Sequence, residues 1–153
     1  MTGPYDRLAE LGLELPPVTP PVAAYVPAVQ TGNHVYVSGQ VPVVDGKLLA
    51  SGKVGAEVNS EEAKKLARRC ALNALAAVDA LVGLDRVVRV VKVVGFVASA
   101  SGFTGQPGVI NGASELFGEV FGPAGQHARS AVGVAELPLG APVEVEAIFE
   151  VTG

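Results

Sequence analysis

Two ionisable side chains near the end of the chain have the chemistry to bind an acid and to move a proton. Arg129 begins a predicted strand directly after His127-Ala128, and Glu144 lies within the next strand along the chain. A guanidinium group offers a planar fork that matches a carboxylate, and a partly desolvated glutamate can orient water or exchange a proton. If the two strands are neighbours, both side chains can share one cleft. The alternative is that Arg129 and Glu144 form only an ion pair between strands.

Other residues offer less for acid–base or nucleophilic chemistry. His127 is a further acid–base candidate, although an isolated histidine after Gly125-Gln126 is more often an ordinary loop residue, and His34 lies at a hairpin turn. Cys70 falls on the apolar side of a predicted helix, so we expect a buried and inert thiol. The sequence contains no nucleophile elbow, no paired aspartates and no metal-ligand spacing, and we expect no metal site.

Length and composition limit the classes of protein. The chain has 153 residues, which predicts a single domain over 1–153, and 49% of them are hydrophobic whereas 17% are charged. A soluble chain with so little charge is expected to bury part of its surface against another copy of itself. The net charge is −4 with only 11 Lys and Arg, which argues against a nucleic-acid partner.

The sequence also indicates where the protein works. A single cysteine excludes an internal disulfide and any cysteine-cluster metal site. No apolar run approaches the roughly 18 residues that a membrane span needs, so no membrane association is expected. The first residues lack the basic and apolar pattern of a signal peptide. We therefore expect a cytoplasmic protein.

Turn residues and apolar periodicity predict an α+β protein with one mixed sheet and two helices on one face. Residues 1–21 form an N-terminal extension with a short helix and a proline-rich connector. The expected elements are a helix at Pro4–Leu13, the connector at Leu15–Pro21, a hairpin of Tyr25–Gln30 and His34–Gln40, a smaller hairpin within Val43–Gly55, a helix that Ser60 caps and Gly83 stops, a strand at Val87–Val97, a helix at Pro107–Phe121, and strands at Ser130–Leu137 and Pro142–Val151.

The predicted strand Val87–Val97 supports the expectation of a second copy. It reads VVRVVKVVGFV, so both of its alternating sets of positions are mainly apolar, with Val88, Val90 and Val94 on one side. A strand that is apolar on both faces is covered on both faces. The two long predicted helices cover one face, and the other face is left to another subunit.

Ordered motifs along most of the chain resemble the RidA (reactive intermediate deaminase, also called YjgF) superfamily. The resemblance extends from about residue 22 to the end of the chain. The motifs are AYVPAVQ at 24–30, GNHVYVSGQVP at 32–42, VVKVVGF at 90–96, VINGASELFGEVF at 109–121, ARSAV at 128–132, LP at 137–138 and VEVEA at 143–147.

This resemblance implies both an architecture and an activity. The fold would be chorismate-mutase-like, in a homotrimer whose sheets form an inner barrel with a pocket at each subunit interface. The activity would be hydrolysis of reactive enamine or imine intermediates, such as 2-aminoacrylate, to 2-keto acids and ammonia. No cofactor is expected, because the imine carbon is already electrophilic and the protein need only hold the acid, place a water and transfer a proton.

Two other functions stay open at this point. One is a non-catalytic trimer that binds a keto acid or an amino-acid derivative in the same arginine pocket. The other is a ribonuclease or translation inhibitor, a description that members of the superfamily often carry. The acidic net charge argues against this last function.

The resemblance also implies roles for individual residues. Arg129 would hold the substrate carboxylate, and Glu144 would position the attacking water. The expected substrate-binding residues are Tyr25, Ser38, Gly39, Asn111 and Ala131.

Several positions depart from the pattern of the superfamily. Ala23-Ala24 precede Tyr25 where Gly-Pro is usual, which can shift the tyrosine. Ala131 stands where a cysteine is frequent, so no thiol takes part, and Gly133 replaces a common glutamate. The N-terminal extension and a longer stretch between Gln40 and Asn111 can reshape the mouth of the pocket. These departures leave the identity of the substrate open.

Overall fold

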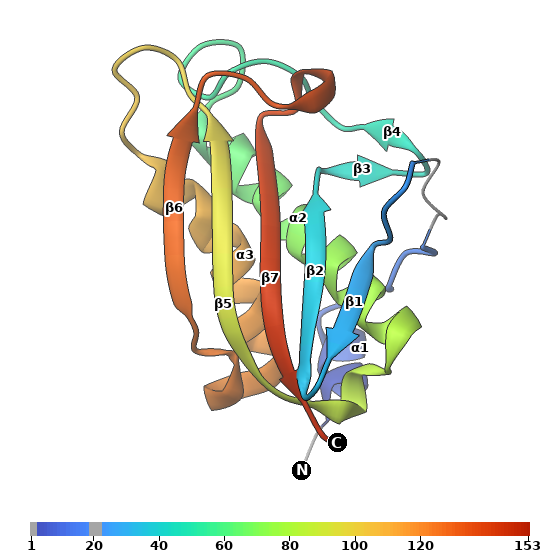
Figure 1. Cartoon of the computed structure of the whole chain (residues 1–153). Helices are drawn as coiled ribbons and strands as arrows, with labels where there is room; N and C mark the ends of the chain where they lie inside the picture. Colours follow the sequence, from blue (N-terminus) through green and yellow to red (C-terminus); the bar gives the residue numbers. More distant parts are fainter. Residues whose placement is uncertain (1–2, 19–22) are drawn as a thin grey trace.

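A computed structural model, which describes residues 3–18 and 23–153, shows a mixed five-stranded sheet with the long helices packed behind it (Figure 1). The strands lie in the order β1-β2-β7-β5-β6; β5 and β6 are parallel and all other neighbours are antiparallel. The strands are β1 Ala28–Thr31, β2 His34–Gln40, β5 Val87–Ala98, β6 Ala128–Val134 and β7 Val143–Val151. The predicted α+β architecture is confirmed.

The N-terminal extension is helical over a shorter stretch than predicted. Helix α1 spans Pro4–Glu10, with Pro4 in its first turn and Leu8 buried against the rest of the protein. The connector continues without helix or strand to Val18. The rest of the predicted connector falls within residues 19–22, which lie outside the described part of the chain. Helix α1 therefore ends before Leu13.

Both predicted hairpins are present, but each is shorter than predicted. Gly32-Asn33 joins β1 to β2, and Gly32 has a φ of 57°, which favours glycine. Strand β1 begins at Ala28 and not at Tyr25, because Pro27 has no N–H group to donate to a neighbouring strand. The second hairpin pairs β3 Val43–Val44 with β4 Lys47–Leu48, so it ends well before Gly55.

Helix α2, Ser60–Leu81, is the long helix at the centre of the layer behind the sheet. Its N-cap is Asn59 and not Ser60: the Asn59 Oδ1 accepts a hydrogen bond of 2.8 Å from the backbone N–H of Glu62. Cys70 is fully buried on the apolar side, as predicted. The helix ends before Gly83, whose φ of 85° is strained for other residues.

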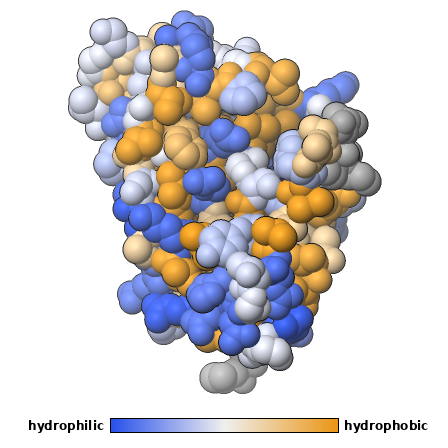
Figure 2. All heavy atoms as spheres, viewed as in Figure 1, coloured by the Kyte–Doolittle hydropathy of each residue, from blue (hydrophilic) through white to orange (hydrophobic). Residues whose placement is uncertain are grey.

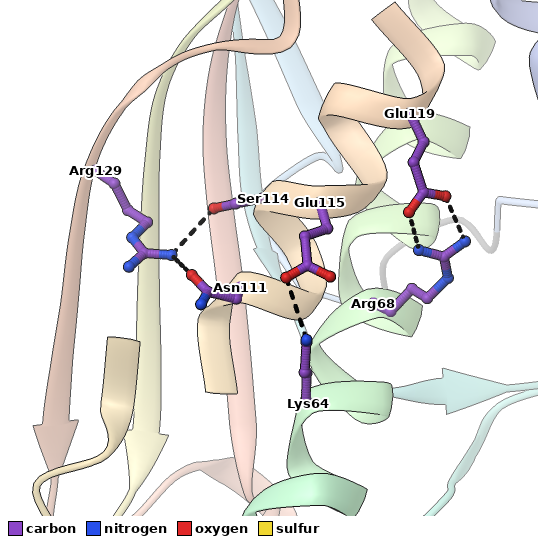
Figure 3. Close-up of polar contacts among 7 residues, drawn as sticks. All are labelled: Lys64, Arg68, Asn111, Ser114, Glu115, Glu119 and Arg129. Atoms are coloured by element: carbon purple, nitrogen blue, oxygen red, sulfur yellow. Dashed lines mark hydrogen bonds and ion pairs between the residues drawn. The ribbon is translucent and has the colours of Figure 1, made fainter. Parts of the chain in front are cut away.

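Helix α3, Gln106–Phe121, packs closely against α2 because Gly112 has no side chain at the contact. A methyl group on Gly112 would overlap the backbone carbonyl of Lys64. Two ion pairs also join these helices, Lys64 to Glu115 at 3.1 Å and Arg68 to Glu119 at 3.0 Å (Figure 3). Lys64 and Arg68 therefore link the two helices while their side chains stay partly exposed.

Strand β5 does not follow the simple alternation that its sequence suggested. Its pairing with β7 shifts between Val87 and Arg89 and again between Val90 and Lys92. As a result, Val90 and Val93 are both fully buried against the helices although they are three residues apart. The predicted grouping of Val90 with Val94 is wrong for this reason, because Val94 belongs to the other face.

No described helix covers the face of the sheet opposite α2, and this face carries apolar side chains (Figure 1). Figure 2 shows hydrophobic side chains distributed over this face between polar ones. Val29 is 53% exposed, and Tyr36 and Val132 are each 43% exposed. The same face carries Val94, Phe96 and Ile148, which are only partly buried. We call this surface the open face.

The described residues contain no helix that is long and apolar enough to cross a membrane.

Candidate functional site

Arg129 faces helix α3, where two side chains hold it. It is the second residue of β6 and pairs with the buried Val93 of β5, so its side chain lies on the helix side of the sheet. The Arg129 Nη1 donates to the Asn111 Oδ1 at 2.8 Å and to the Ser114 Oγ at 3.2 Å (Figure 3). Asn111 and Ser114 are one turn apart on α3, so they lie on the same side of the helix.

These contacts leave a particular part of the guanidinium group free. Nη1 carries two hydrogens, and Asn111 and Ser114 accept both of them. In the described part of the chain, Nε and Nη2 of Arg129 make no hydrogen bond and no ion pair. The Nε–Nη2 edge can bind both oxygens of a carboxylate.

Ser114 is in turn bonded to His127. The Ser114 Oγ lies 2.9 Å from the His127 Nε2, and the His127 Nδ1 lies 2.6 Å from the carbonyl oxygen of Gly125, at the end of the short helix η2, Gly122–Gly125. A carbonyl oxygen only accepts, so Nδ1 carries the proton and Nε2 accepts from the serine hydroxyl. Burial lowers the pKa of His127, the hydrogen bond to the Gly125 carbonyl acts in the opposite direction, and the charge of Arg129 lowers this pKa further.

The sequence-based interpretation of His127 as an ordinary loop residue was incomplete, and Ser114 was missed. His127 also packs edge-on against Phe117, with ring centroids 6.0 Å apart. The signal in the sequence was the spacing of Asn111 and Ser114 on one helix face, together with a histidine two residues before Arg129. Neither spacing shows by itself that the two segments meet.

A shallow pocket of about 350 Å³ lies beside Arg129. Its lining residues are Ser114, Gly118, Gly125, Gln126, His127 and Arg129. Ala131 lies two residues further along β6 on the same side and packs against the core, so it is near this pocket but does not line it. We call this the arginine pocket.

Three of the predicted binding residues meet at a second pocket, of about 320 Å³. Tyr25, Ser38 and Gly39 line it, together with side chains of α2 and with Pro16, Pro17 and Val18 of the connector. Tyr25 is 61% exposed, and Ser38 is held by a hydrogen bond of 2.6 Å from its Oγ to the carbonyl oxygen of Val26. We call this the tyrosine pocket.

Glu144 lies on the open face, next to Gly39. The neighbouring residues Val143 and Val145 are fully buried toward the helices, so Glu144 faces the other way. Its carboxyl group occupies the space above Gly39, where any side chain would overlap it. Burial, and secondly the negative charge of Glu146, raise the pKa of Glu144. A carboxyl group with a raised pKa is suited to taking up and releasing protons.

The structure separates the two residues that sequence reasoning placed together. Strand β5 lies between β6 and β7, so Arg129 and Glu144 are not on neighbouring strands. They also lie on opposite faces of the sheet. Within one chain they form neither the shared cleft nor the ion pair that the sequence suggested. One face holds the arginine pocket with Asn111, and the other holds Glu144 beside Gly39.

Residues 3–18 and 23–153 contain no group of three His, Cys, Asp or Glu side chains close enough together to hold a metal ion.

Comparisons with known proteins agree with the order of motifs in the sequence. The profile of the endoribonuclease L-PSP family matches residues 17–151. Protein TCP17 of Trypanosoma cruzi is 47% identical over 146 residues, which is 94% of this chain and 91% of that protein.

Solved structures are similar over nearly the whole chain. Atu1372 from Agrobacterium tumefaciens, a protein of unknown function, has a TM-score of 0.89 and 46% identity, and the match covers 97% of this chain and 91% of that one. E. coli TdcF, crystallised with bound serine, has a TM-score of 0.66 and 28% identity, covering 91% of this chain and 94% of that one.

Proposed function

Because the chain belongs to the endoribonuclease L-PSP family, which includes the YjgF proteins, we propose that it is an imine deaminase of the RidA type. It hydrolyses reactive enamine or imine intermediates of the 2-aminoacrylate class to 2-keto acids and ammonia. The observation that carries this proposal is the free Nε–Nη2 edge of Arg129, held over a pocket by Asn111 and Ser114. The bound serine of TdcF, a small molecule with a carboxylate, supports a ligand of this class.

The chemistry requires a proton acceptor as well as an anion-binding group. Arg129 holds the carboxylate of the imine, and a water attacks the carbon of the C=N bond. Glu144 takes a proton from that water as the C–O bond forms, and the imine nitrogen gains a proton. The resulting carbinolamine transfers its hydroxyl proton to nitrogen, again through Glu144, and the C–N bond breaks to give the keto acid and ammonia. The two hydrogens of the water thus end on the nitrogen.

The separation of Arg129 and Glu144 in one chain supports a site shared between subunits. We propose a homotrimer in which the arginine pocket of one subunit faces the tyrosine pocket and Glu144 of the next. The uncovered apolar side chains of the open face favour such an assembly, because a large exposed apolar surface is costly in water. The low share of charged residues, 17%, agrees with this expectation.

The activity is tested with an imine that an amino-acid oxidase generates in solution. We expect the protein to accelerate release of the 2-keto acid above the rate of spontaneous hydrolysis. Lack of any acceleration over a range of imines would remove the proposed activity. Binding of keto acids without acceleration would instead identify the protein as a binding trimer.

The shared site is tested by mixing two inactive variants. Arg129→Ala and Glu144→Gln each damage a different half of the site. Random trimers that form after denaturation and refolding of a 1:1 mixture should regain activity at about one quarter of their sites. An intact site needs Arg129 from one subunit and Glu144 from its neighbour, and in the mixture each of these is present with a probability of about one half. Recovery near zero, in a mixture that light scattering shows to be trimeric, would place the whole site within one subunit. A stable monomer would contradict the trimer itself.

The family name favours one further candidate, an endoribonuclease. The net charge of −4 argues against strong RNA binding. If the purified Arg129→Ala variant cleaves RNA as the wild type does, the cleavage points to a contaminating nuclease. If the wild type cleaves RNA and the variant does not, the result supports this second function.

A further inference from the structure

We propose that Ser114 and His127 are positioning residues that hold the Arg129 guanidinium with its Nε–Nη2 edge toward the ligand, and that His127 takes up a proton when an anion binds there. The inference rests on Arg129 as the carboxylate-binding residue of the proposed function. It adds two residues to the site for which the sequence suggested no such role.

The direction of each hydrogen bond carries the first part of the proposal. The Gly125 carbonyl fixes the His127 proton on Nδ1, over a distance of 2.6 Å. The lone pair on Nε2 therefore accepts the hydrogen of the Ser114 hydroxyl at 2.9 Å. With its hydrogen directed at His127, the Ser114 oxygen presents a lone pair to Arg129 Nη1 at 3.2 Å. Each bond thus sets the direction of the next one.

This series of hydrogen bonds determines which part of the Arg129 guanidinium remains free to bind a ligand. Nη1 is held from two sides, by Ser114 and by Asn111, and the planar guanidinium cannot turn without breaking one of these bonds. A long side chain that is held in this way loses less conformational freedom when a ligand binds. The Nε–Nη2 edge is therefore presented in advance to both oxygens of a carboxylate.

The charges around His127 carry the second part of the proposal. Arg129 is linked to His127 through a single serine oxygen, so its positive charge opposes a second positive charge on the imidazole. An anion bound to Arg129 offsets that charge and favours protonation of His127 at Nε2. The Ser114 hydroxyl then turns its hydrogen away from the ring, and its oxygen accepts from both Nε2 and Arg129 Nη1. Other charged groups near this part of the chain include Arg89, which donates to the Gln126 carbonyl at 3.5 Å, Lys92, which pairs with Ala128, and Arg7, which donates to the Glu119 carbonyl at 3.5 Å. Glu115 and Glu119 of α3 are paired with Lys64 and Arg68. In the proposed trimer, Glu144 of the next subunit also faces this pocket.

Proton uptake by His127 on anion binding makes the affinity for the anion depend on pH. If the anion raises the pKa of His127, then protonation of His127 tightens anion binding by the same factor. We expect the wild type to bind pyruvate about threefold to tenfold more tightly near pH 5.5 than near pH 8, because one more positive charge lies close to the ligand. If His127 only positions Ser114 and exerts no such charge effect, His127→Phe should show the same pH dependence of affinity as the wild type.

Calorimetric titration with pyruvate tests both parts in three variants of the full chain. Ser114→Ala should weaken binding about tenfold at either pH, because Arg129 loses one of its two anchors. His127→Phe keeps an aromatic ring against Phe117 but should reduce the pH dependence to the part that Glu144 of the neighbouring subunit contributes. His34→Gln changes the other histidine, which is exposed in the first hairpin, and should bind pyruvate as the wild type does.

Nuclear magnetic resonance gives a readout that needs no ligand. The two histidines give two sets of imidazole signals, and His34 serves as the reference. We expect His127 to carry its proton on Nδ1 near neutral pH and to titrate at a higher pH once pyruvate is bound or Arg129 is replaced with methionine. A proton on Nε2 of His127 would overturn the hydrogen-bond chain regardless of any binding result.

The outcomes separate this inference from the proposed function. A wild type that binds pyruvate as described but does not accelerate imine hydrolysis would end the proposed function and leave the inference standing. Wild-type affinity in folded Ser114→Ala, or no pyruvate binding by the wild type at either pH, would end the inference even if imines are hydrolysed.

Discussion

Replacement of Arg129 with alanine is the sharpest test of the candidate site. The substitution removes the two hydrogen bonds that the Nε–Nη2 edge would make to a substrate carboxylate. Hydrogen bonds to charged groups contribute about 1.5–3 kcal/mol each, so loss of both predicts a kcat/KM roughly 10²- to 10⁴-fold lower. Arg129→Lys should restore little of it, because an ammonium group does not reproduce the planar fork.

The same substitution has a separate and smaller effect on folding. Alanine also removes the bonds to Asn111 and Ser114, at 2.8 and 3.2 Å. Both partners are only partly buried, so water can replace the lost bonds, and we expect a loss of about 1–2 kcal/mol in the free energy of unfolding. For a chain of this length, that loss lowers Tm by roughly 2–8 °C, which leaves the protein folded at assay temperature.

The assay measures Tm and initial rates of keto acid release on the same preparations. Arg68→Ala is the matched control, because it removes another guanidinium that bonds to α3, through Glu119, away from the pocket (Figure 3). Its kcat/KM should stay within about twofold of the wild type, since a partly exposed ion pair away from the pocket contributes little to the site. Wild-type kcat/KM in folded Arg129→Ala would refute the role of Arg129. Activity that falls only in proportion to the folded fraction would assign it a structural role instead.

Three further predictions test other parts of the structure. Glu144→Gln should lose turnover yet unfold at a higher urea concentration than the wild type at neutral pH. Burial and Glu146 raise the pKa of the Glu144 carboxyl above its ordinary value of 4.5, so its ionised form lowers the stability of the folded protein. The stability gained by the glutamine variant should therefore vanish below about pH 4.5, where the carboxyl is protonated in both the folded and the unfolded protein. A less stable variant at neutral pH would mean that the carboxylate has a favourable partner. Burial, then the charge of Glu144, raise the pKa of the Cys70 thiol, so native protein should not react with a thiol reagent until it unfolds. Gly112→Ala should lower stability by about 1–3 kcal/mol, because the methyl group meets the Lys64 carbonyl, whereas Gly108→Ala, with open space at that position, should be neutral or stabilising by a few tenths. Equal melting temperatures for the two alanine variants would contradict the close helix contact.

Elements with strong local signals could be predicted from the sequence. The hairpin at Gly32-Asn33 and strand β2 follow from turn residues and alternation, and α2 follows from its apolar stripe. The cap of α2 was displaced by one residue, because Asn59 and Ser60 are both suitable caps and only the backbone direction decides between them. Such errors do not change which face of the helix is buried.

The faces of β5 could not be predicted in the same way. Nearly every residue of this strand is apolar, so hydrophobicity does not distinguish one face from the other. The two register shifts against β7 arise from pairing with a strand more than 40 residues away, about which the local pattern holds no information. Val90 and Val93 share a face only because of these shifts.

The candidate site shows the same limit at a larger scale. The residue types and motifs identified Arg129, Asn111 and Glu144 one by one, but whether two strands are neighbours depends on the order of strands in the sheet. Insertion of β5 between β6 and β7 separates Arg129 from Glu144, and the pleat turns them to opposite faces. Two half-sites that face away from each other can meet only across copies of the chain. The apolar side chains left uncovered on the open face, and the exposed Tyr25 beside Gly39, are the features of one chain that such an arrangement would use.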